Sequence, residues 1–247
     1  MKPIIIYYIN VKNLMQAADR LCLPTSSFEI QYQIFLSLLD PAVQTRILRY
    51  RKETDRLRSL ASQLLLYHAF YSANPSPDNG SFSISYNSYG KPFFKNYPAY
   101  TFSLSHSGSY AVCAFNEASS PVGIDIQEYR PLNRDRICQR FYTDLEKDSA
   151  ESVAMFFRIW SAKEAYMKYT GKGFSEGLDT FSVLPESAIV VCSGSDSKTL
   201  AYLQEPLMLP GYSCSLCTAS RVIPGSVSVC ELTEADLFTL QTHSEKV

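Results

Sequence analysis

Alternating and helical spacings of apolar residues divide the chain into two similar series of strands and helices. Each half contains a strand, then helices, then further strands, which is the pattern of an α+β fold. In the first half, strands are predicted at 3–11, 82–86, 102–107 and 110–115, and helices at 13–22, 26–39, from Pro41 onward, and at 55–72. In the second half, strands are predicted at 121–127, 181–183, 189–192, 212–218 and 227–230, and helices after Thr143, at 157–170 and at 233–241.

The strand at 121–127 alternates strictly between apolar and polar side chains. Val122, Ile124 and Ile126 point to one face, whereas Asp125 and Gln127 point to the other. Gly123 has no side chain on the Asp125 face, which leaves room there for a bulky neighbour. This strand therefore presents two oxygen donors on one face.

The helix that ends before Gly171 has charged residues on one side. Phe156, Trp160 and Met167 fall near the opposite side and are expected to face a core. Glu164 and Lys168 are four residues apart and share another side, with Lys163 beside them. Taken alone, this pattern is that of a solvated helix, since such pairs contribute only about 0.2–0.5 kcal/mol. Together with Asp125 and Gln127, however, it suggests a Mg²⁺ site whose lysines bind substrate phosphates.

Two motifs resemble a known family. The Gly123-Ile-Asp125 strand and the helix Trp160-Ser-Ala-Lys163-Glu164-Ala-Tyr-Met-Lys168, in this order and at this separation, are similar to those of the 4′-phosphopantetheinyl transferases of the long, surfactin-synthetase-activating type. The resemblance implies transfer of the 4′-phosphopantetheine arm of coenzyme A to a serine of an apo acyl or peptidyl carrier protein. It also implies dependence on Mg²⁺, with Mn²⁺ as an alternative, and release of 3′,5′-ADP.

The resemblance implies a role for each residue of these motifs. Glu164 would be the general base, and Lys168 would stabilise the leaving diphosphate together with Lys163. The implied metal ligands are Asp125, Gln127 and Glu164. Many relatives have a carboxylate where this chain has Gln127, and an amide oxygen attracts a cation less. We therefore expect weaker metal binding here rather than loss of activity.

The coenzyme contacts implied by the resemblance lie in the first half. Six basic residues fall among the fourteen at 46–59, which by itself fits a solvated helical face partly neutralised by Glu53 and Asp55. Within this segment, Arg58-Ser59-Leu60 resembles the start of the helix that binds the 3′-phosphate of coenzyme A, so Arg58 ranks above Arg46. The other implied substrate-binding residues are Ser59, Tyr89, Gly90, Lys91, Pro92, Ser105 and His106.

A faint internal repeat supports two equivalent halves. The segment 108–115 resembles 211–218, and each follows a helix-rich part of the chain. The expected fold is a pseudo-twofold pair of similar α/β halves, each a small, mainly antiparallel sheet with helices, and the active site lies at the seam. The halves are expected at 1–118, on the coenzyme phosphate and adenine side, and at 119–247, with the metal strand, the catalytic helix and the C-terminal sheet. The resemblance implies that the region between strand and helix helps to dock the carrier protein.

Composition restricts the other classes. A net charge of −1 gives no global field for nucleic acid or a membrane surface, and no run approaches the ~20 apolar residues of a membrane span. The first residues are expected to form a strand rather than a signal peptide, and seven dispersed cysteines favour a reducing cytoplasm. Cys214 and Cys217 are expected in the core on opposite faces of a strand. The long form of the family implies a monomer.

Two alternatives remain open at this point. The first is an inactive module that binds coenzyme A or a carrier protein, suggested by Gln127 and by the incomplete basic segment. The intact Lys163, Glu164 and Lys168 argue against it. The second is a different phosphoryl-transfer enzyme, which the absence of a G-x-x-x-x-G-K-[ST] phosphate loop from the sequence disfavours.

Overall fold

A computed structural model describes residues 3–14, 27–78, 81–192 and 198–240. Its first half contains β1 (Ile4–Asn10), α2 (Ser27–Ser37), α3 (Pro41–Leu48), α4 (Glu53–Ala73), β2 (Ile84–Tyr86), β3 (Pro92–Phe94), β4 (Thr101–Ser107) and β5 (Tyr110–Asn116). Its second half contains β6 (Val122–Glu128), α5 (Arg134–Phe141), α6 (Asp144–Ser149), α7 (Val153–Thr170), β7 (Phe181–Leu184), β8 (Ile189–Cys192), β9 (Thr199–Gln204), β10 (Tyr212–Thr218), β11 (Val227–Glu231) and α8 (Glu234–Phe238). The predicted helix at 13–22 lies mostly outside the described residues.

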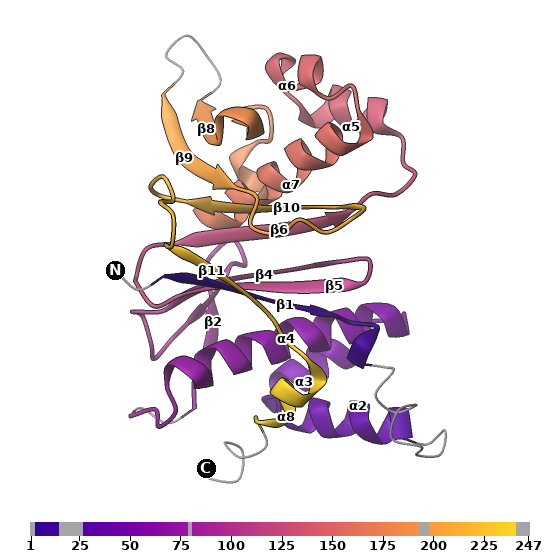
Figure 1. Ribbon diagram of the computed structural model, residues 1–247, viewed down its shortest axis with the longest axis vertical. Helices are drawn as coiled ribbons and strands as arrows, with labels where there is room; N and C mark the ends of the chain where they lie inside the picture. The colour runs from indigo at the N-terminus through magenta and orange to yellow at the C-terminus, as the bar shows by residue number, and fades with distance from the viewer. Residues whose placement is uncertain (1–2, 15–26, 79–80, 193–197, 241–247) are drawn as a thin grey trace.

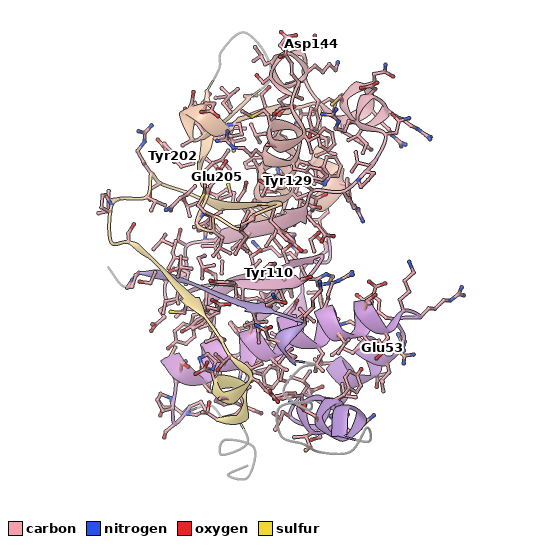
Figure 2. The ribbon with its side chains drawn as sticks, turned by 45° about the vertical axis from the view of Figure 1, so that its right-hand side comes forward. Glu53, Tyr110, Tyr129, Asp144, Tyr202 and Glu205 are labelled. Carbon is pink, nitrogen blue, oxygen red and sulfur yellow. The ribbon has the colours of Figure 1, made fainter. Side chains whose placement is uncertain are left out.

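The elements form layers, with two sheets in the middle and helices outside them (Figure 1). The first sheet has the strand order β11-β1-β5-β4, and α4 packs against it. The second has the order β6-β10-β9-β8-β7, with α7 against β6 and β10. The labelled residues of Figure 2 show the order of these parts. Asp144 lies at the end formed by the second half, Tyr110 lies near the boundary between the halves, and Glu53 lies in the first half. The α+β pair of halves is confirmed.

The faint repeat corresponds to equivalent strands. β5 lies antiparallel beside β1, the first strand of its half, and β10 lies antiparallel beside β6, the first strand of the other half. The long helices α4 and α7 then cover the outer faces of these strand pairs. The two segments that resemble each other in sequence therefore occupy the same place in the two halves.

The predicted division of the chain needs a correction at its end. β11 pairs in parallel with β1, so it belongs to the sheet of the first half although it comes last in the sequence. Leu232, just before α8, and Leu237, within α8, are buried in the core of the first half. The chain therefore crosses back to the first half after β10, which is the last strand in sequence that belongs to the second sheet.

The seam has its own apolar core. Ile6, Val112 and Ala114 of the first sheet meet side chains of β6 and β10, and Ile124 and Ile126 are fully buried among them. Cys214 belongs to this cluster, whereas Cys217 faces the α7 side. Both cysteines are buried in the core, as predicted, on opposite faces of β10.

Helix α7 ends where the sequence predicts, whereas its start at Val153 precedes the predicted range of 157–170. The Ser152 side chain accepts a hydrogen bond from the backbone N–H of Met155, and Gly171 ends the helix in the left-handed conformation with φ +72°. The space left by Gly123 is occupied by this helix. A Cβ atom on Gly123 would lie 2.0 Å from the carbonyl oxygen of Ala165. Within the described part of the chain, no helix is long and apolar enough to cross a membrane.

Candidate active site

Asp125 is the centre of a hydrogen-bonded cluster at the seam. Its Oδ1 accepts hydrogen bonds from Ser105 Oγ at 2.6 Å and from Lys168 Nζ at 2.7 Å. Its Oδ2 accepts one from Gln127 Nε2 at 2.7 Å. The side chains come from β4, α7 and β6, and Asp125 itself is only 3% exposed. Both halves of the chain therefore contribute to the environment of one buried carboxylate.

Glu164 lies one helical turn before Lys168 and faces the same region. Burial and, second, the negative charge of Asp125 raise the pKa of Glu164 to about 7, although Lys168 opposes this. Among the described residues, its carboxylate has no hydrogen-bond or ion-pair partner. A half-buried carboxylate with a pKa near neutrality is suited to accept a proton, or to bind a cation that removes the repulsion from Asp125.

Two of the three predicted metal ligands, Asp125 and Glu164, are arranged in a way that fits a divalent cation. Asp125 and Glu164 are oxygen donors close enough to interact electrostatically, and Mg²⁺ is usually held by one or two carboxylates, with water and substrate phosphates in the other positions. Gln127, however, directs its NH₂ group toward Asp125, so its amide must turn over before its oxygen could bind the same ion. In the described ranges, no group of three His, Cys, Asp or Glu residues is arranged as a metal site.

Two adjoining cavities open on either side of this cluster and share Leu104 and Lys168. The first, of about 240 Å³, is lined by Glu164, Met167, the 89–92 turn, 102–104, Gly171, Gly173 and Phe174. The second, of about 370 Å³, is lined by Arg46, Tyr50, Ser59, Ser62, Gln63, Ser105, His106 and Asp125. An elongated ligand with several phosphates could therefore pass Lys168 and contact both halves.

The basic residues of the first half occupy different places. Arg46 lines the second cavity and hydrogen-bonds the hydroxyl of Tyr86. Arg58, which the sequence ranked higher, lines neither cavity. Its Nε donates to the carbonyl oxygen of Gly108 at 2.9 Å, and its Nη1 pairs with Asp55 at 2.9 Å. Asp55, three positions earlier in α4, pairs with Arg58, so Arg46 rather than Arg58 faces a cavity.

The 89–92 turn lines the first cavity, as the predicted coenzyme-binding role requires, but its lysine points inward. Lys91 Nζ donates to the carbonyl oxygens of Val122 at 3.3 Å and Tyr169 at 3.1 Å. Burial lowers the pKa of Lys91 to about 8. Gly90 adopts φ +88°, and Tyr89 is exposed. Lys91 thus connects this turn to β6 and to the end of α7.

His106 lies in the second cavity with part of its ring open to solvent. Partial removal from water lowers the pKa of His106, and the positive charges of Lys168 and Arg58 lower it further. The neutral imidazole is therefore favoured at neutral pH. In that form it can donate only one hydrogen bond to an anion.

The expected role of Lys163 needs a correction. Its side chain is fully buried on the far side of α7, where Nζ pairs with Glu146 Oε2 at 2.8 Å. It also donates to the carbonyl oxygens of Leu178 at 2.6 Å and Phe181 at 3.0 Å. With these acceptors and no exposed surface, Lys163 does not reach either cavity and cannot bind the leaving diphosphate in this arrangement.

Glu146 is the residue that the sequence analysis missed. Its spacing from Thr143 is that of a capping box, a local motif, and the structure contains this box, since Glu146 Oε2 accepts the Thr143 N–H at 2.8 Å. Its Oε1 also accepts the Val183 N–H at 2.7 Å. The local motif predicted the first of these contacts. The ion pair and the bond to β7 depend on segments distant in sequence.

Comparisons with known proteins identify similar sequences. Residues 121–217 match the model of the 4′-phosphopantetheinyl transferase superfamily, and residues 25–118 match that of the 4′-phosphopantetheinyl transferase N-terminal region. The chain is similar to 4′-phosphopantetheinyl transferase Sfp of Bacillus subtilis (strain 168), with 32% identity over 79% of this chain and 88% of that protein. It is also similar to 4′-phosphopantetheinyl transferase psf-1 of Bacillus pumilus, with 36% identity over 69% of this chain and 74% of that protein.

Proposed function

This chain belongs to the 4′-phosphopantetheinyl transferase superfamily, and from that membership we propose how the seam site carries out its reaction. The protein is an enzyme that transfers the phosphopantetheine arm of coenzyme A to a serine of a carrier protein. The observation that carries the mechanism is the position of Glu164, whose carboxylate has no partner among the described residues and whose pKa is raised to about 7, beside the Asp125–Lys168 ion pair.

The reaction exchanges one phosphorus–oxygen bond for another. The hydroxyl oxygen of the carrier serine bonds to the phosphorus that bears pantetheine, and the bond from that phosphorus to the bridging oxygen breaks. 3′,5′-ADP leaves with the bonding electrons. Glu164 accepts the hydroxyl proton, directly or through water, because its carboxylate lines the first cavity and has no competing partner among the described residues. Lys168 stabilises the negative charge that develops on the 5′-phosphate of the leaving 3′,5′-ADP.

Asp125 and Glu164 are proposed to hold Mg²⁺ or Mn²⁺ together with pyrophosphate oxygens and water. When bound, the ion neutralises charge on the pyrophosphate. Asp125 is fixed by three donors, so it offers a rigid ligand, whereas Glu164 has no competing partner in the described residues. Gln127 is the third ligand only after its amide turns over. The pair of carboxylates supports the cation proposal, and the neutral amide supports weaker binding than a third carboxylate would give.

Coenzyme A is proposed to occupy both cavities, with its anionic groups around Lys168, Arg46 and His106. The shared wall of the two cavities allows one elongated molecule to contact β4, α3 and the 89–92 turn. Arg46 then replaces Arg58 as the expected contact for the 3′-phosphate. Ser59 lines the same cavity and is available as a further polar contact.

The carrier protein is proposed to dock beside α5 and α6. In α5 no residue is buried, and Leu145 at the start of α6 is 60% exposed. In this proposal the exposed Leu145 side chain supplies an apolar contact to the docked carrier protein. Leu145→Asp is expected to raise the KM for the carrier protein about tenfold while the KM for coenzyme A stays the same. Equal KM values for the carrier in both proteins would exclude this surface.

The transfer is tested by the intact mass of an apo carrier protein after incubation with this enzyme, coenzyme A and Mg²⁺. Wild type should add the mass of one phosphopantetheine, whereas Glu164→Ala should not. Glu186→Ala is the matched control, because Glu186 is 72% exposed and lies away from both cavities. No gain on several apo carriers, despite measurable coenzyme A binding, would instead support a binding module.

A further inference from the structure

β4 and β6 lie side by side at the seam without forming a backbone ladder. β4 is an edge strand of the first sheet, and β6 is an edge strand of the second. In an antiparallel pair such as β6 and β10, every second residue directs its N–H away from the partner strand. The N–H groups that β6 directs outward are buried at the seam, where each needs another acceptor.

Serine side chains of β4 provide these acceptors at regular spacing. The Ile124 N–H donates to Ser103 Oγ at 3.0 Å, and the Ile126 N–H donates to Ser105 Oγ at 3.3 Å. The Glu128 N–H donates to the next serine of the series, Ser107 Oγ, at 3.0 Å. Because side chains on a strand share a face at every second residue, 103, 105 and 107 match 124, 126 and 128 with the same period.

The middle serine also holds the Asp125 carboxylate. Ser105 Oγ donates its hydrogen to Asp125 Oδ1 at 2.6 Å, and a hydroxyl has only one hydrogen to donate. While this bond lasts, Ser105 cannot donate to a phosphate oxygen. Its side chain is 7% exposed, and that of Ser103 is 5% exposed. Ser105 is therefore placed to orient Asp125 rather than to bind coenzyme A.

We propose that Ser103, Ser105 and Ser107 form a side-chain ladder that fixes the register of β6 on β4 and, through Ser105, the position of Asp125. These three serines, called the seam ladder, are positioning residues. A shift of β6 along β4 would leave its outward N–H groups without acceptors and would move Asp125, together with Lys168 of the same half, away from Ser105 and His106 of β4. The seam ladder thus couples the two halves at the point where the site needs both.

The direct test is amide hydrogen exchange along β6. Ser103→Ala should make the Ile124 amide exchange about tenfold faster, and Ser107→Ala should do the same for Glu128, because each loses its acceptor. Ser103→Thr keeps the hydroxyl and should restore slow exchange. Ser182→Ala is the control, because Ser182 is buried but bonds Thr143 far from the seam. Ser107 lines neither cavity, so its variant also tests the ladder if the others fail to fold.

A second measurement separates positioning from coenzyme binding. Ser105→Ala should weaken binding of Mn²⁺ alone about fivefold and lower kcat, while the KM for coenzyme A stays within twofold. The proposal is overturned if the β6 amides of Ser103→Ala and Ser107→Ala exchange as in wild type, or if Ser182→Ala changes them equally. It is also overturned if the main effect of Ser105→Ala is a loss of coenzyme A affinity. This binding and kinetic measurement rests on the proposed function. The exchange measurement does not, so a protein without transferase activity would still test the ladder.

Discussion

Lys163 Nζ lies 2.8 Å from Glu146 Oε2, and neither side chain has any exposed surface. The pair joins α7 to α6 on the side of the helix opposite to the site. Burial raises the pKa of Glu146 and lowers that of Lys163, while their attraction acts against both effects. Two adjacent charges of one helix thus have separate functions: Lys163 stabilises the packing of α7, and Glu164 faces the cavity.

Lys163→Met is expected to lower the free energy of unfolding by about 3–5 kcal/mol, because it leaves the Glu146 carboxylate buried without a counter-charge. The double variant Glu146→Gln/Lys163→Met should recover part of this loss. Urea unfolding measures both effects. The kcat of the folded Lys163→Met enzyme should stay within a few-fold of wild type, whereas Lys168→Met should lose most of its turnover. Normal stability with lost turnover in Lys163→Met would mean that Lys163 reaches the substrate.

The two arginines of the basic segment are distinguished by coenzyme A and its 3′-dephospho form. Arg46→Ala should raise the KM for coenzyme A about tenfold and leave that for the dephospho form nearly unchanged, because Arg46 lines the cavity. Arg58→Ala should affect the two substrates equally, since Arg58 bonds Gly108 and Asp55 instead. Steady-state kinetics at fixed salt decides between them. The reverse result would return the phosphate contact to Arg58.

Local patterns predicted the elements that carry the site. Strict alternation predicted β6 with Asp125 and Gln127 on one face, and the stop at Gly171 predicted the end of α7. These features depend on neighbours within a few residues, so the sequence contains the information directly. The equivalence of β5 and β10 was visible only as a short repeat, which the strand pairing explains.

Features set by distant segments were not predictable in this way. Lys163 is adjacent to Glu164, and only Glu146, seventeen positions earlier, determines that it is buried (163 − 146 = 17). The parallel pairing of β11 with β1 joins opposite ends of the chain. Ser103 and Ser107 alternate like residues of a solvated strand face, but a second sheet covers that face. Periodicity gives the direction of a side chain and not the partner that it meets.

Gln127→Glu tests the weak-metal hypothesis. A carboxylate in place of the amide removes the hydrogen bond to Asp125 and adds a negative charge near it. We expect lower thermal stability without metal, a larger stabilisation by Mg²⁺, and a several-fold lower Mg²⁺ concentration at half-maximal rate. Thermal unfolding and rates across a Mg²⁺ series measure these effects. An unchanged Mg²⁺ dependence would show that Gln127 does not influence the cation.

Lys91 should make stability depend on alkaline pH. Its pKa is about 8 when folded, against 10.5 for an ordinary lysine, so between these values the unfolded chain binds more protons. The unfolding free energy therefore rises with pH in this interval, by up to about 1.4 kcal/mol per unit. Lys91→Met lacks this contribution. Subtracting its unfolding free energy from that of wild type at each pH removes the effects of the titrating groups that both proteins contain. A difference independent of pH from 8 to 10.5 would mean that Lys91 stays charged.

Gly123→Ala is expected to be strongly destabilising. The added Cβ would lie 2.0 Å from the carbonyl oxygen of Ala165 and 2.4 Å from the backbone nitrogen of Tyr169, and neither backbone atom can move without displacing α7 from β6. Gly211→Ala is the control, since nothing lies within 4 Å of its Cβ position and only its left-handed φ of +77° costs about 1–2 kcal/mol. Thermal unfolding should show a much larger loss for Gly123→Ala, with α7 and β6 amides exchanging fastest. Equal losses in the two variants would show that α7 can withdraw from β6 at little cost, and the site would then be adjustable rather than rigid.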